Sequence, residues 1–284
     1  MAATLIDGKA IAATIRAEVK ADVAALRDKG IVPKLSVLLV GDDPASVVYA
    51  RSKEKSCSNV GIEFELVTMP GTTPVEEVLA TIDGWNKDPK VHGIMIELPL
   101  PKGMDKKVVL EAVDPKKDVD GSHPINRGYI LSGGEGLFPA TPESCIEVML
   151  RSGFEIKGKN AVIVGRGETV GKPLVFMMLN QNATVTVCHT KTQDLGYHTR
   201  QADIVIAAVG RAKMVTADMI KPGAIVVDAG INPAEGGGIC GDVDFENAKE
   251  VAGAISPVPG GVGSLTTVLI QKNVLKAIKL QGLA

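Results

Sequence analysis

Three glycines, at positions 165, 167 and 171, form the part of the sequence whose spacing most directly suggests chemistry. They lie between an apolar run of strand type, residues 161–164, and an apolar helical pattern, residues 174–179. In such a unit the first glycine permits a tight turn, the second admits a pyrophosphate, and the third lets the helix pack on the sheet. The N–H groups of the first helical turn would then bind phosphate. The third glycine is one residue later than in the usual G-x-G-x-x-G, so a purely structural turn is the alternative.

The residues after the next predicted strand, 184–188, indicate which dinucleotide would bind. A fold that binds NAD usually carries Asp or Glu there, which accepts hydrogen bonds from the ribose hydroxyls. Here the residues are His189, Thr190 and Lys191, and Arg166 lies in the glycine turn. These side chains can donate hydrogen bonds, and no acidic residue lies among them. This favours a 2′-phosphate, and hence NADP over NAD. A solvated basic turn is the alternative interpretation.

A second group of polar residues comes earlier in the chain. Tyr49 and Lys53 are four residues apart in a predicted helix, residues 45–60, so they share one face. The ordinary interpretation of such a pair is a half-buried tyrosine and a solvated lysine. Glu97 directly follows a buried-strand run, residues 94–96, and the carboxyl ends of strands line the ligand crevice of open α/β sheets. Glu97 therefore either lines such a crevice or has left the sheet and is solvated.

Composition narrows the class of protein. A length of 284 residues, 45% of them hydrophobic, predicts one or two domains with an ample core. The formal net charge of −2 gives no indication of a nucleic-acid or membrane-surface partner. Without a C-x-x-C pair, the cysteines argue against a zinc site and fit a reducing compartment; they are Cys57, Cys145, Cys188 and Cys240. No signal peptide or bilayer-spanning run is evident, so we expect a cytoplasmic protein with no metal.

Alternating strand and helix patterns predict an α/β fold with two domains and parallel sheets. Predicted strands are residues 35–40, 64–69, 92–96, 161–164, 184–188, 203–209 and 224–231. The glycine-rich span 128–139 predicts a connector, and Thr141-Pro142 predicts a helix start. We therefore expect one α/β domain from residues 1–139 plus 266–284, and a Rossmann-like dinucleotide-binding domain from residues 140–265. The final helical pattern, residues 265–280, is long enough to return to the first domain.

Taken together, several motifs resemble the methylenetetrahydrofolate dehydrogenase/cyclohydrolase family along nearly the whole chain. They are Val40-Gly-Asp-Asp-Pro-Ala-Ser46, Tyr49 with Lys53, Leu98-Pro-Leu-Pro101, Lys117-Asp-Val-Asp-Gly121, Val164-Gly-Arg166 with Val170-Gly-Lys-Pro173, Gly241-Asp-Val-Asp-Phe245, and Pro257-Val-Pro-Gly-Gly-Val-Gly263. The resemblance implies a homodimeric enzyme of one-carbon metabolism with a folate cleft between its domains. Such enzymes oxidise 5,10-methylenetetrahydrofolate with NADP or NAD, and usually hydrolyse the methenyl product to 10-formyltetrahydrofolate.

The resemblance also implies roles for individual residues. Tyr49 would pack against the folate rings, Asp120 would accept paired hydrogen bonds from the pterin edge, and Lys53 would be the general acid/base, which must spend time neutral. The turn Pro259-Gly260-Gly261 would close the folate side of the cleft. On the cofactor side, the expected contacts are Gly165, Arg166 and Gly167 with the phosphates, Thr190 with the adenosine ribose or its phosphate, and Ile231 near the nicotinamide.

The chain departs from the family pattern at its catalytic centre, where Glu97 replaces a usual glutamine. A carboxylate beside Lys53 would favour the protonated amine and stabilise the cationic methenyl product. We therefore expect an NADP-dependent dehydrogenase with weak or absent cyclohydrolase. A fully bifunctional enzyme and a non-catalytic dinucleotide-binding module are the alternatives. Other departures are Gly167 in place of a common serine, Ser122 in place of an aromatic residue, and Ser264-Leu265 in place of Pro-Met.

Overall fold

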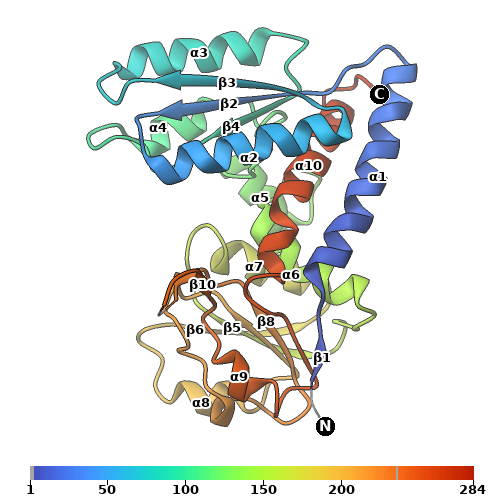
Figure 1. Cartoon of the computed structure of the whole chain (residues 1–284), viewed down its shortest axis with the longest axis vertical. Coiled ribbons are helices and arrows are strands. Elements are labelled where there is room, and N and C mark those ends of the chain that lie inside the picture. Colours follow the sequence, from blue (N-terminus) through green and yellow to red (C-terminus); the bar gives the residue numbers. More distant parts are fainter. Residues whose placement is uncertain (1–2, 235) are drawn as a thin grey trace. The chain divides into compact units, whose positions relative to one another are not determined.

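A computed structural model describes residues 3–234 and 236–284 of the chain (Figure 1). The chain forms two compact units. We call residues 14–138 and 267–284 the first domain, and residues 1–13 and 139–266 the second domain. The difference from the expected division is that residues 1–13 belong to the second domain. The reason is that β1 (Thr4–Leu5) pairs in parallel with β11 (Ala254–Ile255), a contact between the two ends of the sequence.

The first domain contains a parallel sheet in the order β3-β2-β4. Its strands are β2 (Lys34–Val40), β3 (Glu63–Met69) and β4 (Gly93–Ile96). Figure 1 shows α2 (Pro44–Val60) and α3 (Val75–Lys87) on opposite faces of this sheet. Leu38 and Ile94 on the sheet pack with Ile82 of α3 and Val109 of α4 (Lys106–Glu111) in one buried cluster. Burial along nearly the whole of β2 and β4 explains their apolar runs, whereas β3, the outer strand of this sheet, is only partly buried.

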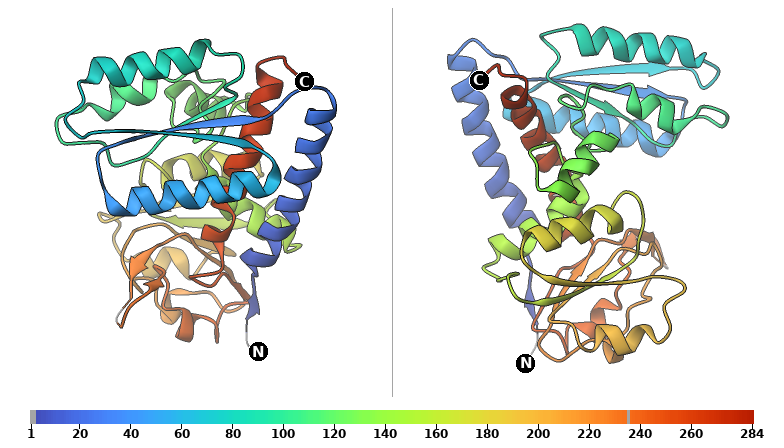
Figure 2. Two further views of the ribbon diagram at one scale, coloured as in Figure 1. Left: turned by 45° about the horizontal axis from the view of Figure 1, so that its top comes forward. Right: turned by 180° about the vertical axis from the view of Figure 1, so that it is seen from behind.

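The first domain also contains most of α1 (Gly8–Asp28) and two further helices. The helix α5 (Pro124–Ser132) occupies part of the span that the sequence predicted as a connector, so that prediction is wrong for residues 128–132. The His123 ring caps this helix, because its Nδ1 accepts a hydrogen bond from the N–H of Ile125 at 3.1 Å. The last helix, α10 (Thr266–Leu280), packs on this domain (Figure 2). Its Asn273 donates hydrogen bonds to the carbonyls of Val119 and Phe138 at 2.8 and 2.9 Å.

The second domain is a parallel sheet in the order β1-β11-β8-β7-β5-β6. Its main strands are β5 (Asn160–Val164), β6 (Thr184–Cys188), β7 (Ile204–Ala207) and β8 (Ile225–Asp228). The chain passes from β5 to β6 and then back across β5 to β7, so the strand order reverses at β5. In open α/β sheets the ligand crevice lies at such a reversal, outside the carboxyl ends of the strands.

Helices cover both faces of this second sheet. Figure 1 shows α6 (Ala140–Arg151) and α7 (Gly171–Asn180) on one side, with α8 (Leu195–Thr199) and α9 (Phe245–Ala248) on the other. A short antiparallel pair, β9 (Asn232–Pro233) with β10 (Ile239–Cys240), lies beyond β8, and single 3-10 turns span Ala217–Met219 and Val262–Ser264. Among the described residues of the chain, no helix has the length and apolar character needed to cross a bilayer.

Candidate active and dinucleotide-binding sites

A buried ion pair lies at the carboxyl end of β4 in the first domain. Lys53, on α2, places its Nζ 2.5 Å from Oε1 of Glu97, and the side chains are 13% and 8% exposed. The Glu97 N–H donates to the Leu38 carbonyl at 2.8 Å, so the backbone of Glu97 continues the pairing of β4 with β2. The alternatives of a solvated Glu97 and a solvated Lys53 are therefore wrong. Each charge compensates the desolvation of the other.

Contacts at the start of α2 fix the position of Lys53. Asp43 caps the helix by accepting the Ser46 N–H at 2.8 Å. The Ser46 hydroxyl donates to Oδ2 of Asp43 at 2.8 Å and lies 3.3 Å from the Leu98 carbonyl, which joins the first turn of α2 to the segment after Glu97. Tyr49, one helical turn before Lys53, is 59% exposed. A half-buried tyrosine was the ordinary expectation, but the ring is available to a ligand.

Asp120 adds a second carboxylate to this group. The pKa of Asp120 is raised to about 6, mainly by burial and then by the charge of Asp118, with a smaller contribution from Glu97. The Ser122 hydroxyl, which donates to Oδ2 of Asp120 at 2.9 Å, and the Lys53 charge both lower this pKa. Asp120 therefore interacts electrostatically with both members of the ion pair. The sequence showed Ser122 only as a departure, and its hydroxyl two residues after an acid was the available signal.

The loop that carries Asp120 is anchored on both sides. The buried ammonium of Lys117 donates to the carbonyls of Trp85, Asn86 and Asp88 at the end of α3, at 2.8–2.9 Å. A cation is favourable at a helix carboxyl terminus, although burial lowers the pKa of Lys117. Asp118 accepts hydrogen bonds from the His123 N–H at 2.8 Å and the Asn126 side chain at 2.9 Å.

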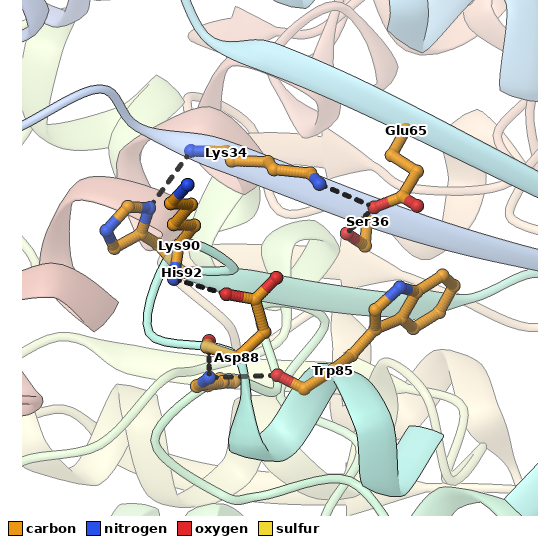
Figure 3. Close-up of polar contacts among 8 residues, drawn as sticks. Lys34, Ser36, Glu65, Trp85, Asp88, Lys90 and His92 are labelled. Carbon is orange, nitrogen blue, oxygen red and sulfur yellow. Dashed lines mark hydrogen bonds and ion pairs between the residues drawn. The ribbon is translucent and has the colours of Figure 1, made fainter. Parts of the chain in front are cut away.

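The first domain also has a cavity of about 490 Å³. It lies at the amino ends of the strands, at the opposite edge of the sheet from the ion pair. Its lining includes Lys90 and His92, from the segment that leads into β4, and Glu63, which begins β3. Figure 3 shows this edge, where the Lys34 N–H donates to Nδ1 of His92 and the Lys34 ammonium pairs with Glu65 at 2.7 Å. Five residues of extended chain separate His92 from Glu97, or about 16 Å. This cavity is therefore separate from the Lys53–Glu97 pair.

The glycine turn of the second domain lines a cavity of about 280 Å³. Gly165 has φ +121°, and a Cβ there would lie 2.1 Å from the Ala208 carbonyl oxygen. At Gly171 a Cβ would lie 2.3 Å from the Gly165 carbonyl oxygen, whereas at Gly167 it would meet nothing within 4 Å. The first and third glycines are thus required by close packing, and the second leaves open space next to the amino terminus of α7. This arrangement fits a bound pyrophosphate.

The predicted cofactor residues divide into two groups. Gly165, Arg166, Gly167 and Thr190 all line the cavity, together with His189. Lys191 and Ile231 are not part of its lining, and Ile231 is 58% exposed. The predicted strand 224–231 was too long, because β8 ends at Asp228 and the Gly230 N–H turns back to that side chain at 2.9 Å.

A further wall of this cavity was not predicted from the sequence. It consists of Ala208, Val209, Arg211 and Met214, which follow β7. Because β7 lies beside β5, its carboxyl end opens on the same crevice as the glycine turn. The strand pattern was available in the sequence, but the strand order was not. The turn at Pro259, Gly260 and Gly261 packs separately on the start of α1 (Gly8–Asp28), where a Cβ on Gly8 would lie 2.1 Å from the Gly261 carbonyl oxygen.

Comparisons with known proteins match both domains. A family model described as the tetrahydrofolate dehydrogenase/cyclohydrolase catalytic domain matches residues 6–120, and one described as the NAD(P)-binding domain of the same enzymes matches residues 139–282. The chain is 68% identical over 280 residues to a "Bifunctional protein FolD" of Pelotomaculum thermopropionicum, with 99% of each chain covered.

Two solved structures extend this similarity. One is the bifunctional enzyme FolD of Campylobacter jejuni, with 45% identity, a TM-score of 0.96, and 99% and 100% of the two chains covered. The other is the Trypanosoma brucei FolD, described as complexed with NADP cofactor and inhibitor, with 35% identity, a TM-score of 0.93 and all of both chains covered.

The fold and its two sites define a two-domain α/β enzyme with an NAD(P)-binding domain. The chain belongs to the tetrahydrofolate dehydrogenase/cyclohydrolase family. The resemblance found in the sequence is thereby confirmed. The family combines an oxidoreductase and a hydrolase activity on one-carbon derivatives of tetrahydrofolate.

Proposed function

We propose that this protein oxidises 5,10-methylenetetrahydrofolate with NADP and hydrolyses the methenyl product weakly or not at all. The observation that carries the second part is the 2.5 Å contact between Lys53 and Glu97. A lysine that activates water must lose its proton. An adjacent buried carboxylate stabilises the charged ammonium and so opposes that loss. The alternative is a fully bifunctional enzyme, as the name of the Pelotomaculum thermopropionicum relative describes.

The chain's own groups would position the substrate for this reaction. Tyr49 offers an exposed ring for the folate to pack on, and the Asp120 carboxylate can accept two parallel hydrogen bonds from the pterin edge. Glu97 would stabilise the positive charge that develops as the methylene carbon becomes the methenyl cation. NADP, held by Gly165, Arg166, Gly167 and Thr190, would supply the hydride acceptor. We expect the active form to be a homodimer, as in the family.

Mixing the purified protein with methylenetetrahydrofolate and each dinucleotide tests this function directly. Methenyl absorbance should appear with NADP and should decay no faster than the spontaneous hydrolysis of methenyltetrahydrofolate. A non-catalytic dinucleotide-binding module would produce no absorbance change, although it would bind the nucleotide. Enzymatic decay as fast as formation would identify the fully bifunctional alternative.

NADP should give a higher kcat/KM than NAD. Arg166, His189 and Thr190 line the cavity and can donate hydrogen bonds to a 2′-phosphate, and the lining residues that the structure describes include no Asp or Glu. The Arg166→Ala variant should lower kcat/KM for NADP by about tenfold or more, the effect of losing one charge-assisted hydrogen bond. Lys191→Ala is the matched control, because Lys191 lies outside the cavity lining. Equal efficiency with NAD, or an unchanged NADP efficiency in Arg166→Ala, would contradict the preference.

The KM for methylenetetrahydrofolate should rise as the pH falls through about 6, the pKa of Asp120. Below that pH the carboxyl is protonated and loses its paired acceptor geometry, whereas above it the carboxylate is present. Ser122→Ala should move this inflection to higher pH, because the Ser122 hydroxyl lowers the pKa of Asp120. Initial rates between pH 5 and 8 give the profile, with the KM for NADP as an internal control. A flat folate profile would remove Asp120 from substrate binding.

A further inference from the structure

The motif Gly241-Asp-Val-Asp-Phe245 has no role in the proposed chemistry, yet its first acid is completely buried. Asp242 accepts three successive backbone N–H groups from the loop after β7. Its Oδ2 accepts from Val209 at 2.6 Å and Gly210 at 3.0 Å, and its Oδ1 accepts from Arg211 at 2.8 Å. Val209 and Arg211 are the same residues that form the unpredicted wall of the dinucleotide cavity.

Asp242 also holds a second segment. Its Oδ1 accepts the side-chain N–H of Asn232 at 2.8 Å, which fixes the chain just after Ile231. The segment 230–232 follows β8, and the loop 209–211 follows β7, so one carboxylate joins the segments that leave two adjacent strands. A Cβ on Gly230 would lie 2.2 Å from Cγ of Asp242. Only glycine therefore allows the chain to pass this close to the carboxylate.

A second buried acid supports the first. Asp228, at the end of β8, accepts the N–H groups of Gly230, Asp242 and Val243 at 2.8–3.0 Å. The pKa of Asp228 is raised to about 6, mainly by burial and also by the charge of Asp242, while these N–H donors oppose the rise. A Cβ on Gly241 would lie 1.9 Å from Oδ2 of Asp228. The glycine and first acid of the motif are thus both explained by this pair of carboxylates.

The donors that bond Asp242 and Asp228 are neutral N–H groups, and they order the loop that they belong to. Two buried carboxylates are costly to desolvate, and the donors named above are backbone or amide N–H groups rather than cations. Charge-assisted hydrogen bonds from several N–H groups are short and directional, so they hold a loop in one conformation. A wall that is ordered before its ligand arrives loses less conformational freedom on binding.

We propose that Asp242 is a positioning residue for the dinucleotide site: it holds the loop 209–211, which forms part of the cavity wall, in the arrangement that binds the dinucleotide, and joins that loop to the segment 230–232. The proposal rests on the proposed function only in assigning the cavity to a dinucleotide. It is tested by binding, without turnover, so that it can fail or succeed independently of the folate reaction.

The test is the affinity of purified variants for NADP⁺, measured by isothermal titration calorimetry. Asp242→Asn keeps the shape but turns an amide NH₂ toward backbone N–H donors, so Kd should rise about 10- to 100-fold, the effect of lost charge-assisted bonds. Asp244→Asn is the matched control, because Asp244 belongs to the same motif but bonds the side chain of Asn247 at 2.6 Å, and its Kd should match the parent.

Asn232→Ala provides a second variant, because it removes one neutral donor to Asp242 and should raise Kd about threefold or more even if Asp242→Asn fails to fold. A lower Tm with unchanged Kd in the folded variant would show a purely structural role and overturn the proposal. Unchanged Kd in Asn232→Ala, where Asp242→Asn does not fold, would overturn it as well. If the parent protein binds NADP⁺ but does not oxidise methylenetetrahydrofolate, the proposed function fails and this test still decides. A parent that binds neither dinucleotide would overturn both.

Discussion

The Glu97→Gln variant should hydrolyse methenyltetrahydrofolate about tenfold faster than the natural protein, without a matching gain in hydride transfer. The amide that replaces the carboxylate no longer stabilises the ammonium of Lys53, which is 13% exposed. A loss of about 1.4 kcal/mol from the attraction between the two groups corresponds to a tenfold change in an equilibrium. Removing one partner of a buried pair leaves the other charge uncompensated.

Two measurements make this experiment specific. Glu65→Gln is the control, since Glu65 pairs with Lys34 in the same domain but at the opposite edge of the sheet, and both rates should stay unchanged (Figure 3). The Glu97 charge raises the pKa of Asp120, so Glu97→Gln should also move the folate KM inflection to lower pH. If the natural protein already hydrolyses methenyltetrahydrofolate as fast as it produces it, the interpretation of the ion pair is wrong.

The Lys53→Met variant should lose enzymatic hydrolysis of methenyltetrahydrofolate, whether made alone or together with Glu97→Gln. In the second background the loss should be about 100-fold, the usual contribution of a general acid/base. Methylenetetrahydrofolate oxidation should persist, because hydride transfer needs position and charge rather than this proton. Lys55→Met, an exposed change on another face of α2, is the matched control.

The Tm of Lys53→Met should be lower than the Tm of the double variant Lys53→Met with Glu97→Gln. Lys53→Met leaves the Glu97 carboxylate buried and unpaired, so its Tm should fall by several degrees. Lys53→Met with Glu97→Gln removes both charges, and its Tm should recover toward that of the natural protein. An unchanged rate of hydrolysis when Lys53→Met is added to Glu97→Gln would show that Lys53 is only a structural partner of Glu97.

The sequence predicted local features better than long-range ones. The turn from β5 to α7 was predictable, because each glycine acts within a few residues of its neighbours. The helix α5 was not, since Gly128 weakens its pattern and its stability depends on the His123 cap and on tertiary packing. The placement of residues 1–13 depends on Thr4 pairing with Ala254, a register that local patterns do not contain.

In the candidate active site, too, local spacing was predictable and long-range contacts were not. Tyr49 and Lys53 could be placed on one helical face from their spacing, but the partner of Lys53 is 44 residues away in sequence. Spacing alone therefore could not decide whether Glu97 was solvated. The Ser122 contact with Asp120 and the cavity wall at Arg211 depend on loop conformation and strand order, which follow from the assembled fold.

The ion pairs at the two ends of the first-domain sheet are well separated, and this separation affects how the sequence can vary. The reactive pair Lys53–Glu97 lies at the carboxyl ends of the strands, whereas the Lys34–Glu65 pair and the His92 ring lie at the amino ends. Sites separated by more than about 10 Å, with no shared partner, contribute additively to stability. Substitutions at Lys34 or Glu65 should therefore change thermal stability additively with substitutions at Lys53 or Glu97, so the two ends of this sheet can vary in sequence separately.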